Sequence, residues 1–268
     1  MLGILGKNSE KWVETDIAWW LSNIAVVTLY DTLNENIIEY IVEQTELSTI
    51  ACTSDHIETL FEMQSSKNYS FFQNIVVFDD FSIELENRCS KIGLKLLSFN
   101  QLIVEGRKLE LGLDSPTKDD LFTICYTSGV TGDLKGVMLT HANVVSLWSS
   151  LLRTSINFKS TDVYLSYLPL AHTYERMMMV SIIQSGASYG FYQGDVMNLR
   201  EDLLSLKPTV FASVSRLYLR IYKSIISQIK SLKGCKNCLI QKAIRSKLEN
   251  YKKNGSLTHC FYDKLIFN

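Results

Sequence analysis

The chain has 268 residues, of which 46% are hydrophobic and 21% are charged. This length and hydrophobic content suffice for one large domain or two small ones with a sizeable core, and they exclude an intrinsically disordered chain. With 27 Lys and Arg against 28 Asp and Glu, the formal net charge is −1. That balance argues against a general nucleic-acid-binding protein, so no nucleic-acid partner is expected.

Short β-branched runs alternate with segments of helical period in the N-terminal part of the chain. Asn8 or Ser9 can cap a first helix, which is followed by a buried strand at 25–30. Thr32 and Glu35 have the spacing of a capping box for a second helix. Further strands are expected at 48–52, 75–78 and 95–99. Strands separated by helices predict an α/β fold with right-handed crossovers and a mainly parallel sheet.

A polar turn at 115–120 is predicted to separate two α/β subdomains, at 1–112 and 113–268. After this turn, strands are expected at 121–126, 136–139, 162–168, 188–192 and 209–214. Helices are expected at 142–155 and over most of 215–253. Residues 262–268 are apolar and periodic but stop without a cap or turn residue, a pattern that suggests a chain cut short.

Six scattered cysteines read as free thiols of an intracellular protein, because no secretory signal precedes them. Cys235 and Cys238 form a CxxC pair, and His259 with Cys260 would have to complete a zinc site. The second pair lacks the usual ligand spacing, so a metal site is not expected there. No run reaches the ~20 apolar residues that a membrane span needs, so any membrane attachment is expected to be peripheral.

Residues 126–136 read YTSGVTGDLKG and lie between two predicted strands. Glycines allow positive φ and a close backbone approach to an anion, and successive N–H groups in such turns form an anion nest. The hydroxyl groups add donors, and Lys135 supplies a mobile cation for phosphate oxygens. The spacing differs from that of a Walker A loop. The residues alone therefore leave two interpretations open, which are a phosphate cradle and a Gly- and Thr-rich hairpin turn.

This segment is similar to the signature Tyr-Thr-Ser-Gly-Thr-Thr-Gly-x-Pro-Lys-Gly of the AMP-forming adenylating enzymes. Val130 stands in place of a Thr or Ser of that signature, and Leu134 in place of its Pro. The flanking motifs resemble those of one family, the long-chain acyl-CoA synthetases. These are MLTHANV at 138–144, YLPLAHTYER at 167–176, GFYQGD at 190–195, LKPTVF at 206–211, NSEKW at 8–12 and LYDTL at 29–33.

The resemblance implies an incomplete large N-terminal domain of an adenylating enzyme, with parallel-sheet βαβ layers. It implies that ATP, Mg²⁺ and coenzyme A serve the activation of a long-chain fatty acid. It assigns a catalytic position to His172, next to the acyl-adenylate, and a metal contact to Thr131. It assigns the triphosphate to Thr127, Ser128, Gly129, Val130, Thr131, Gly132 and Lys135.

Three residue groups keep an alternative interpretation. His172, by position alone, also fits a hydrogen-bonded structural histidine. Glu175 and Arg176 are expected to pair with each other or to cap a helix. The apolar segment 177–183 fits either a core helix or part of an acyl tunnel.

Several parts of the family pattern are expected to lie outside this chain. They are a Tyr-Gly-x-Thr-Glu motif, a later ribose-binding Asp, and a hinge with a small C-terminal lid domain that carries a catalytic Lys. Two functions therefore remain open: a long-chain fatty acid–CoA ligase, of which this fragment alone has little activity, and a noncatalytic remnant that binds a nucleotide or a partner.

The last part of the chain is strongly basic. Residues 216–268 hold 12 Lys and Arg against 2 Asp and Glu, a local net charge of +10, so the remainder carries −11. A surface for anionic lipid or for the phosphates of coenzyme A is one interpretation, and a solvated helical face is the other. The first would suit a location at the cytoplasmic face of the endoplasmic reticulum or of another organelle.

Overall fold

The computed structural model describes residues 1–110, 112, 114–128, 134–151, 153, 156–232, 234–256 and 258–267. These residues form two compact units, 1–212 and 213–268. Among the described helices, none is both long and apolar enough to cross a lipid bilayer.

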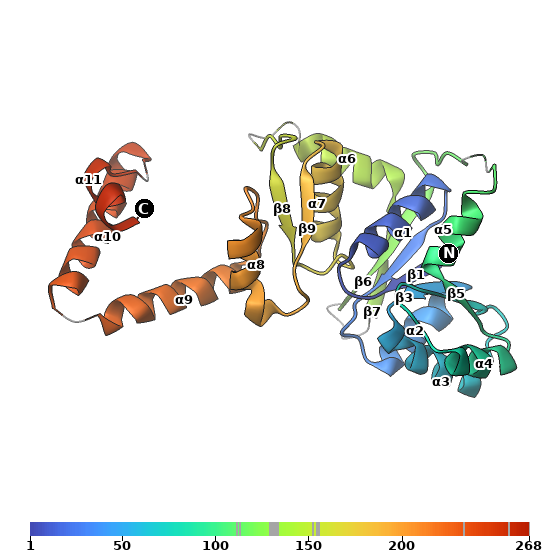
Figure 1. The fold of residues 1–268 in the computed structure, drawn as a ribbon. Helices are drawn as coiled ribbons and strands as arrows, with labels where there is room; N and C mark the ends of the chain where they lie inside the picture. The colour runs from blue at the N-terminus through green and yellow to red at the C-terminus, as the bar shows by residue number, and fades with distance from the viewer. Residues whose placement is uncertain are drawn as a thin grey trace. The chain divides into compact units, whose positions relative to one another are not determined.

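A seven-stranded sheet forms the centre of the first unit (Figure 1), in the order β5-β4-β3-β1-β2-β6-β7. All neighbouring strands run parallel except β6 and β7, which form an antiparallel hairpin at one edge. The strands are β1 (Leu2–Leu5), β2 (Val26–Leu29), β3 (Thr49–Cys52), β4 (Asn74–Val77), β5 (Lys95–Ser98), β6 (Leu121–Ser128) and β7 (Leu134–Thr140). The predicted α/β class with a mainly parallel sheet is confirmed.

Helices cover both faces of this sheet, as parallel strands require. One face packs against α2 (Glu35–Thr45), α3 (Ile57–Lys67) and α4 (Ile83–Lys91), with the short η1 (Ser54–His56) before α3. The other face packs against α1 (Glu10–Leu21) and α5 (Phe99–Gly106). Alternate strand residues supply the two cores, as in β1, where Leu5 joins the first and Ile4 the second.

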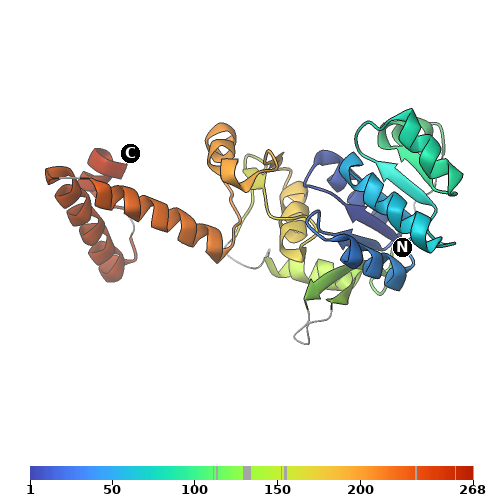
Figure 2. The ribbon, with the colours of Figure 1, turned by 90° about the horizontal axis from the view of Figure 1, so that it is seen from below.

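A second sheet follows in the chain, made of the parallel strands β8 (Val163–Ser166) and β9 (Ser188–Phe191). Helix α7 (Thr173–Gln184) connects them and contributes Met179 to a core of the large sheet and Met178 to the core beside β8. The remaining elements of this part are α6 (His141–Leu151), η2 (Val196–Asn198) and α8 (Leu199–Leu206). Figure 2 shows the β6–β7 hairpin in green at the sheet edge, beside α6.

The second unit is helical, with α9 (Ser215–Ser231), α10 (Cys235–Asn254), α11 (Cys260–Tyr262) and the π-helical turn η3 (Asp263–Phe267). The predicted long helix is broken before α10, where Gly234 has a φ of 70°. Only glycine adopts that conformation without strain. The two subdomains predicted at 1–112 and 113–268 stay a prediction, although β6 joins the same sheet as β1 to β5.

The strand at the middle of the large sheet, at residues 2–5, was not predicted. Two local predictions need correction. Asn34, not Thr32, caps α2, because its side chain accepts a hydrogen bond from the backbone N–H of Ile37. Residues 209–214 form no strand, and only Val210 pairs there, through a single bridge to Tyr164.

Candidate active site

The predicted phosphate segment begins and ends on the two strands of the β6–β7 hairpin. Thr127 on β6 and Lys135 on β7 are cross-strand partners, and both side chains are exposed. The backbone of Ser128 pairs with Leu134. The structure thus brings the two ends of the candidate segment together. The side chain of Ser128 and the candidates Gly129, Val130, Thr131 and Gly132 lie outside the described residues.

Gly136 has a packing role that the sequence did not reveal. It lies within β7, opposite Tyr126, and an added Cβ would come within 2.8 Å of Ile124 Cγ2 and 3.2 Å of Tyr126 Cζ. The absence of a side chain at Gly136 therefore lets the Ile124 and Tyr126 side chains of β6 pack against β7, and the expectation that this glycine supplies positive φ is wrong. Burial raises the pKa of the Tyr126 phenol to about 12, so this side chain stays neutral at physiological pH.

A groove of about 570 Å³ runs along one side of the hairpin. Its lining includes Lys135 and Gly136 from β7, and Tyr40 and Gln44 from α2. The Lys135 ammonium group therefore belongs to an open surface and takes no part in core packing. This exposure is what a phosphate-binding lysine requires.

His172 caps the N-terminus of α7. Its Nδ1 accepts a hydrogen bond from the backbone N–H of Tyr174 at 3.1 Å, and the backbone N–H of His172 donates to the carbonyl oxygen of Pro169 at 2.9 Å. The side chain is exposed. Nδ1 of His172 thus has a structural partner while the imidazole still reaches solvent, and the catalytic position of this residue stays a prediction.

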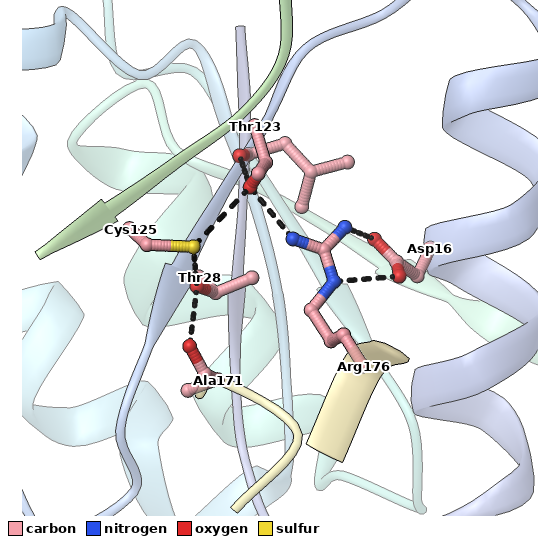
Figure 3. Close-up of polar contacts among 7 residues, drawn as sticks. Asp16, Thr28, Thr123, Cys125, Ala171 and Arg176 are labelled. Carbon is pink, nitrogen blue, oxygen red and sulfur yellow. Dashed lines mark hydrogen bonds and ion pairs between the residues drawn. The ribbon is translucent and has the colours of Figure 1, made fainter. Parts of the chain in front are cut away.

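The residue before His172 is attached to the large sheet. The hydroxyl of Thr28 on β2 donates to the carbonyl oxygen of Ala171 at 3.0 Å, and it also contacts the Cys125 sulfur at 3.8 Å (Figure 3). Thr28 is the register partner of Cys125, which lies two residues before Thr127. His172 and Thr127 therefore both lie at the carboxyl edge of β2 and β6, where ligands of open α/β sheets bind.

Arg176 carries the second connection between α7 and the large sheet. Its Nη2 and Nε form a bidentate pair with the Asp16 carboxylate at 2.6 and 3.1 Å, and its Nη1 donates to the Thr123 hydroxyl at 2.7 Å (Figure 3). The guanidinium also lies 4.8 Å from the ring centroid of Phe122. Burial raises the pKa of the Asp16 carboxyl, and the Arg176 charge opposes that rise.

Glu175 is buried on another side of α7, against the small sheet. Tyr164 on β8 donates to Glu175 Oε2 at 2.7 Å, and the Tyr189 hydroxyl on β9 lies 2.9 Å from both Glu175 Oε1 and Ser166 Oγ. Burial raises the pKa of Glu175, and these hydrogen bonds partly oppose the rise. Glu175 and Arg176 were expected to pair with each other or to cap a helix; they do not pair, since each has its own partners.

No cluster of three or more metal-ligating side chains occurs within the part of the chain that the structure describes. Thr131, the predicted metal contact, lies outside that part. The hairpin offers a hydroxyl and an ammonium group facing solvent from opposite strands, which are groups suited to phosphate oxygens.

Residues 1–262 match the family described as AMP-binding enzyme, so the chain belongs to that family of proteins. It is 39% identical over its whole length to long chain acyl-CoA synthetase 6, peroxisomal, of Arabidopsis thaliana. It is 34% identical over its whole length to long-chain-fatty-acid–CoA ligase 5 of Rattus norvegicus. The chain spans 38% and 39% of these two relatives, so it corresponds to a part of each.

Solved structures share the fold. The adenylation domain of a carboxylate reductase from Mycobacterium chelonae superposes with a TM-score of 0.79 at 21% identity, covering 95% of this chain and 41% of that one. The A-PCP didomain of a carboxylic acid reductase from Segniliparus rugosus, in complex with AMP, superposes with a TM-score of 0.75 at 22% identity, over 92% and 37% of the two chains. The predicted fold of a partial adenylation domain is confirmed.

Proposed function

We propose that this chain belongs to an enzyme that activates long-chain fatty acids with ATP. In the first step a carboxylate oxygen attacks the α-phosphorus, the bond to the leaving phosphate breaks, and an acyl-adenylate and pyrophosphate form. In the second step the thiolate of coenzyme A attacks the acyl carbon, the bond between that carbon and the phosphate oxygen breaks, and AMP leaves with that oxygen. Fatty acid, ATP and coenzyme A are thus the proposed substrates.

One observation carries the proposal: Thr127 and Lys135 face each other across a hairpin whose sequence resembles the adenylating signature. The names of the relatives supply the substrate class. Lys135 would neutralise charge on the triphosphate, and Thr127 would donate to a phosphate oxygen. The cradle between them would be completed by Ser128, Gly129, Val130, Thr131 and Gly132.

The proposed role of His172 is to line the acyl-adenylate site from the start of α7. Mg²⁺ is proposed to be held mainly by the phosphates of ATP, with Thr131 as its contact from this chain, as is usual for this ion at nucleotide sites. Peripheral membrane association through the basic segment 216–268, at the cytoplasmic face of an organelle, completes the proposal. Two relatives are named as peroxisomal, which supports an intracellular location.

ATP–pyrophosphate exchange tests the reaction. We expect palmitate to stimulate exchange by the natural gene product that contains these residues, with benzoate and an acid-free sample as controls. The isolated 268-residue chain is expected to bind ATP weakly and to exchange little. Exchange stimulated by benzoate but not by palmitate would contradict the substrate class, and the absence of ATP binding would contradict the proposal as a whole.

The second candidate is a noncatalytic remnant that binds a nucleotide or a partner. Its support is the replacement of a signature hydroxyl by Val130 and of a signature proline by Leu134. Saturable ATP binding by the natural gene product, without exchange for any fatty acid of 8 to about 20 carbons, would favour this candidate. Palmitate-dependent exchange would rule it out.

A further inference from the structure

The six residues between β8 and α7 form a short loop that ends at His172. Its chain leaves β8 at Ser166, passes Leu168 and Leu170, and reaches the N-cap of α7. Leu170 and Ala171 are buried, whereas His172 is exposed. The position of the His172 imidazole therefore depends on what holds the buried part of this loop.

Asn8, between β1 and α1, uses its whole side-chain amide to hold the loop. Its Nδ2 donates to Ser166 Oγ at 2.8 Å and to the carbonyl oxygen of Leu168 at 2.7 Å. Its Oδ1 accepts from the backbone N–H of Leu170 at 2.9 Å. The two N–H groups and the oxygen of the amide are thus all engaged, across about 160 residues of sequence.

Thr28 provides the second attachment, through its hydroxyl bond to the Ala171 carbonyl oxygen (Figure 3). Thr28 is buried, with 1% of its surface exposed, and its backbone is fixed by pairing with both β1 and β6. Asn8 holds the loop from the segment that follows β1, and Thr28 holds it from β2. Together they fix the loop relative to the same sheet that carries Thr127.

We infer that Asn8 and Thr28 are positioning residues, which set the place of His172 relative to the β6–β7 hairpin. The inference rests on the proposed function, since His172 is there the group beside the acyl-adenylate. Neither residue needs to touch the substrate. A displacement of about 1 Å at a reacting centre can cost a factor of about 100 in rate, so attachments of this kind matter to such a reaction.

The test uses the whole chain with the substitutions Thr28→Val, Thr28→Ser and Asn8→Leu. Valine keeps the shape of threonine and removes the hydroxyl, whereas serine keeps the hydroxyl. Thr45→Val is the matched control, because the buried Thr45 hydroxyl also donates to a backbone carbonyl, that of Ile41 in α2. The sequence contains four histidines, so ¹H–¹⁵N imidazole spectra resolve His172 once its signal is assigned with His172→Gln.

We expect Thr28→Val and Asn8→Leu to shift the His172 imidazole and Tyr174 amide signals and to leave the signals of His56 unchanged. Thr28→Ser and Thr45→Val should match the wild type. In the natural gene product, affinity for palmitoyl sulfamoyl adenosine, an unreactive acyl-adenylate analogue, should fall about tenfold with each of the two shifting variants.

Unchanged His172 signals in both Thr28→Val and Asn8→Leu would overturn the inference, whatever the protein binds. Shifted signals with unchanged analogue affinity would overturn the positioning role in the reaction. If the wild-type natural gene product does not bind the analogue but the signals still shift, the proposed function fails while the attachment of the loop stands. A general loss of folding would move the His56 signals too. In that case the comparison of Thr28→Val with Thr28→Ser decides whether the Thr28 hydroxyl holds the loop.

Discussion

Glu175 and Arg176 are adjacent on α7, yet their side chains bind different sheets. Glu175 contacts Tyr164 of the small sheet at 2.7 Å, and Arg176 contacts Asp16 beside the large sheet at 2.6 Å. Successive positions on a helix point in directions about 100° apart, which allows one turn to serve both neighbours. The first turn of α7, which begins after His172, is thereby fixed between two sheets.

The Asp16–Arg176 pair is buried, so its removal from one side is expected to be costly. Asp16→Ala leaves the guanidinium without its counter-ion and should lower the free energy of unfolding by about 3–5 kcal/mol. The double variant Asp16→Leu, Arg176→Met should recover most of that loss, because neither charge then remains buried. Urea unfolding followed by tryptophan fluorescence measures this, since all four tryptophans lie within residues 1–212.

The surface pair of Arg88 and Glu58 is the control for that measurement. Both side chains are about half exposed, so Arg88→Ala should change the unfolding midpoint less than Asp16→Ala does. If Asp16→Ala and Arg88→Ala lowered the free energy of unfolding equally, burial of the Asp16–Arg176 pair would contribute nothing to the loss.

Glu175 predicts a pH dependence of stability. Burial raises its pKa above the ordinary 4.5, so the folded state binds this proton more tightly than the unfolded state does. The stability that protonation contributes is complete below pH 4.5 and is lost as the pH rises toward the raised folded pKa. Glu175→Gln has no such loss, so its urea midpoint relative to the wild type should rise between pH 4.5 and 7. Parallel pH profiles of the two proteins would contradict this prediction.

Lys135 is expected to contribute directly to nucleotide affinity. Lys135→Ala should weaken ATP binding about tenfold or more, because it removes a cation from the phosphate site, while the folded fraction stays unchanged since the side chain is exposed. Lys118→Ala, also an exposed lysine, is the matched control. Titration with a fluorescent ATP analogue measures both, and equal affinity of the two variants would remove Lys135 from the site.

Gly136 is expected to tolerate no side chain. Gly136→Ala places a Cβ 2.8 Å from Ile124 Cγ2, so the hairpin must shift, at a cost of about 1–3 kcal/mol. Gly106→Ala is the control, because nothing lies within 4 Å of its Cβ position at the end of α5. Thermal unfolding should separate the two variants, and similar midpoints would show that the sheet yields freely at Ile124.

The sequence predicted well what depends on neighbouring residues. Short β-branched runs marked β2 to β5 and residues 121–126 of β6. The capping chemistry of Ser9 is visible in the hydrogen bond that its side chain accepts from the Trp12 N–H. β1 was missed because its four residues include a glycine and stand beside another. Gly3 is needed there, since a Cβ would lie 2.8 Å from Leu47 Cδ1. The local sequence pattern does not predict this contact.

The amino-acid sequence by itself thus determined the α/β class, the family resemblance and the candidate segment at 126–136. These features depend on local periodicity and on motif spacing. Tertiary structure decided the partners of Arg176 and Glu175, the attachment of the His172 loop to Asn8, and the packing role of Gly136. Those contacts join residues far apart in the chain, such as Asn8 and Leu170. A side chain of fixed hydrogen-bonding capacity accepts many partners, and only the folded backbone selects one.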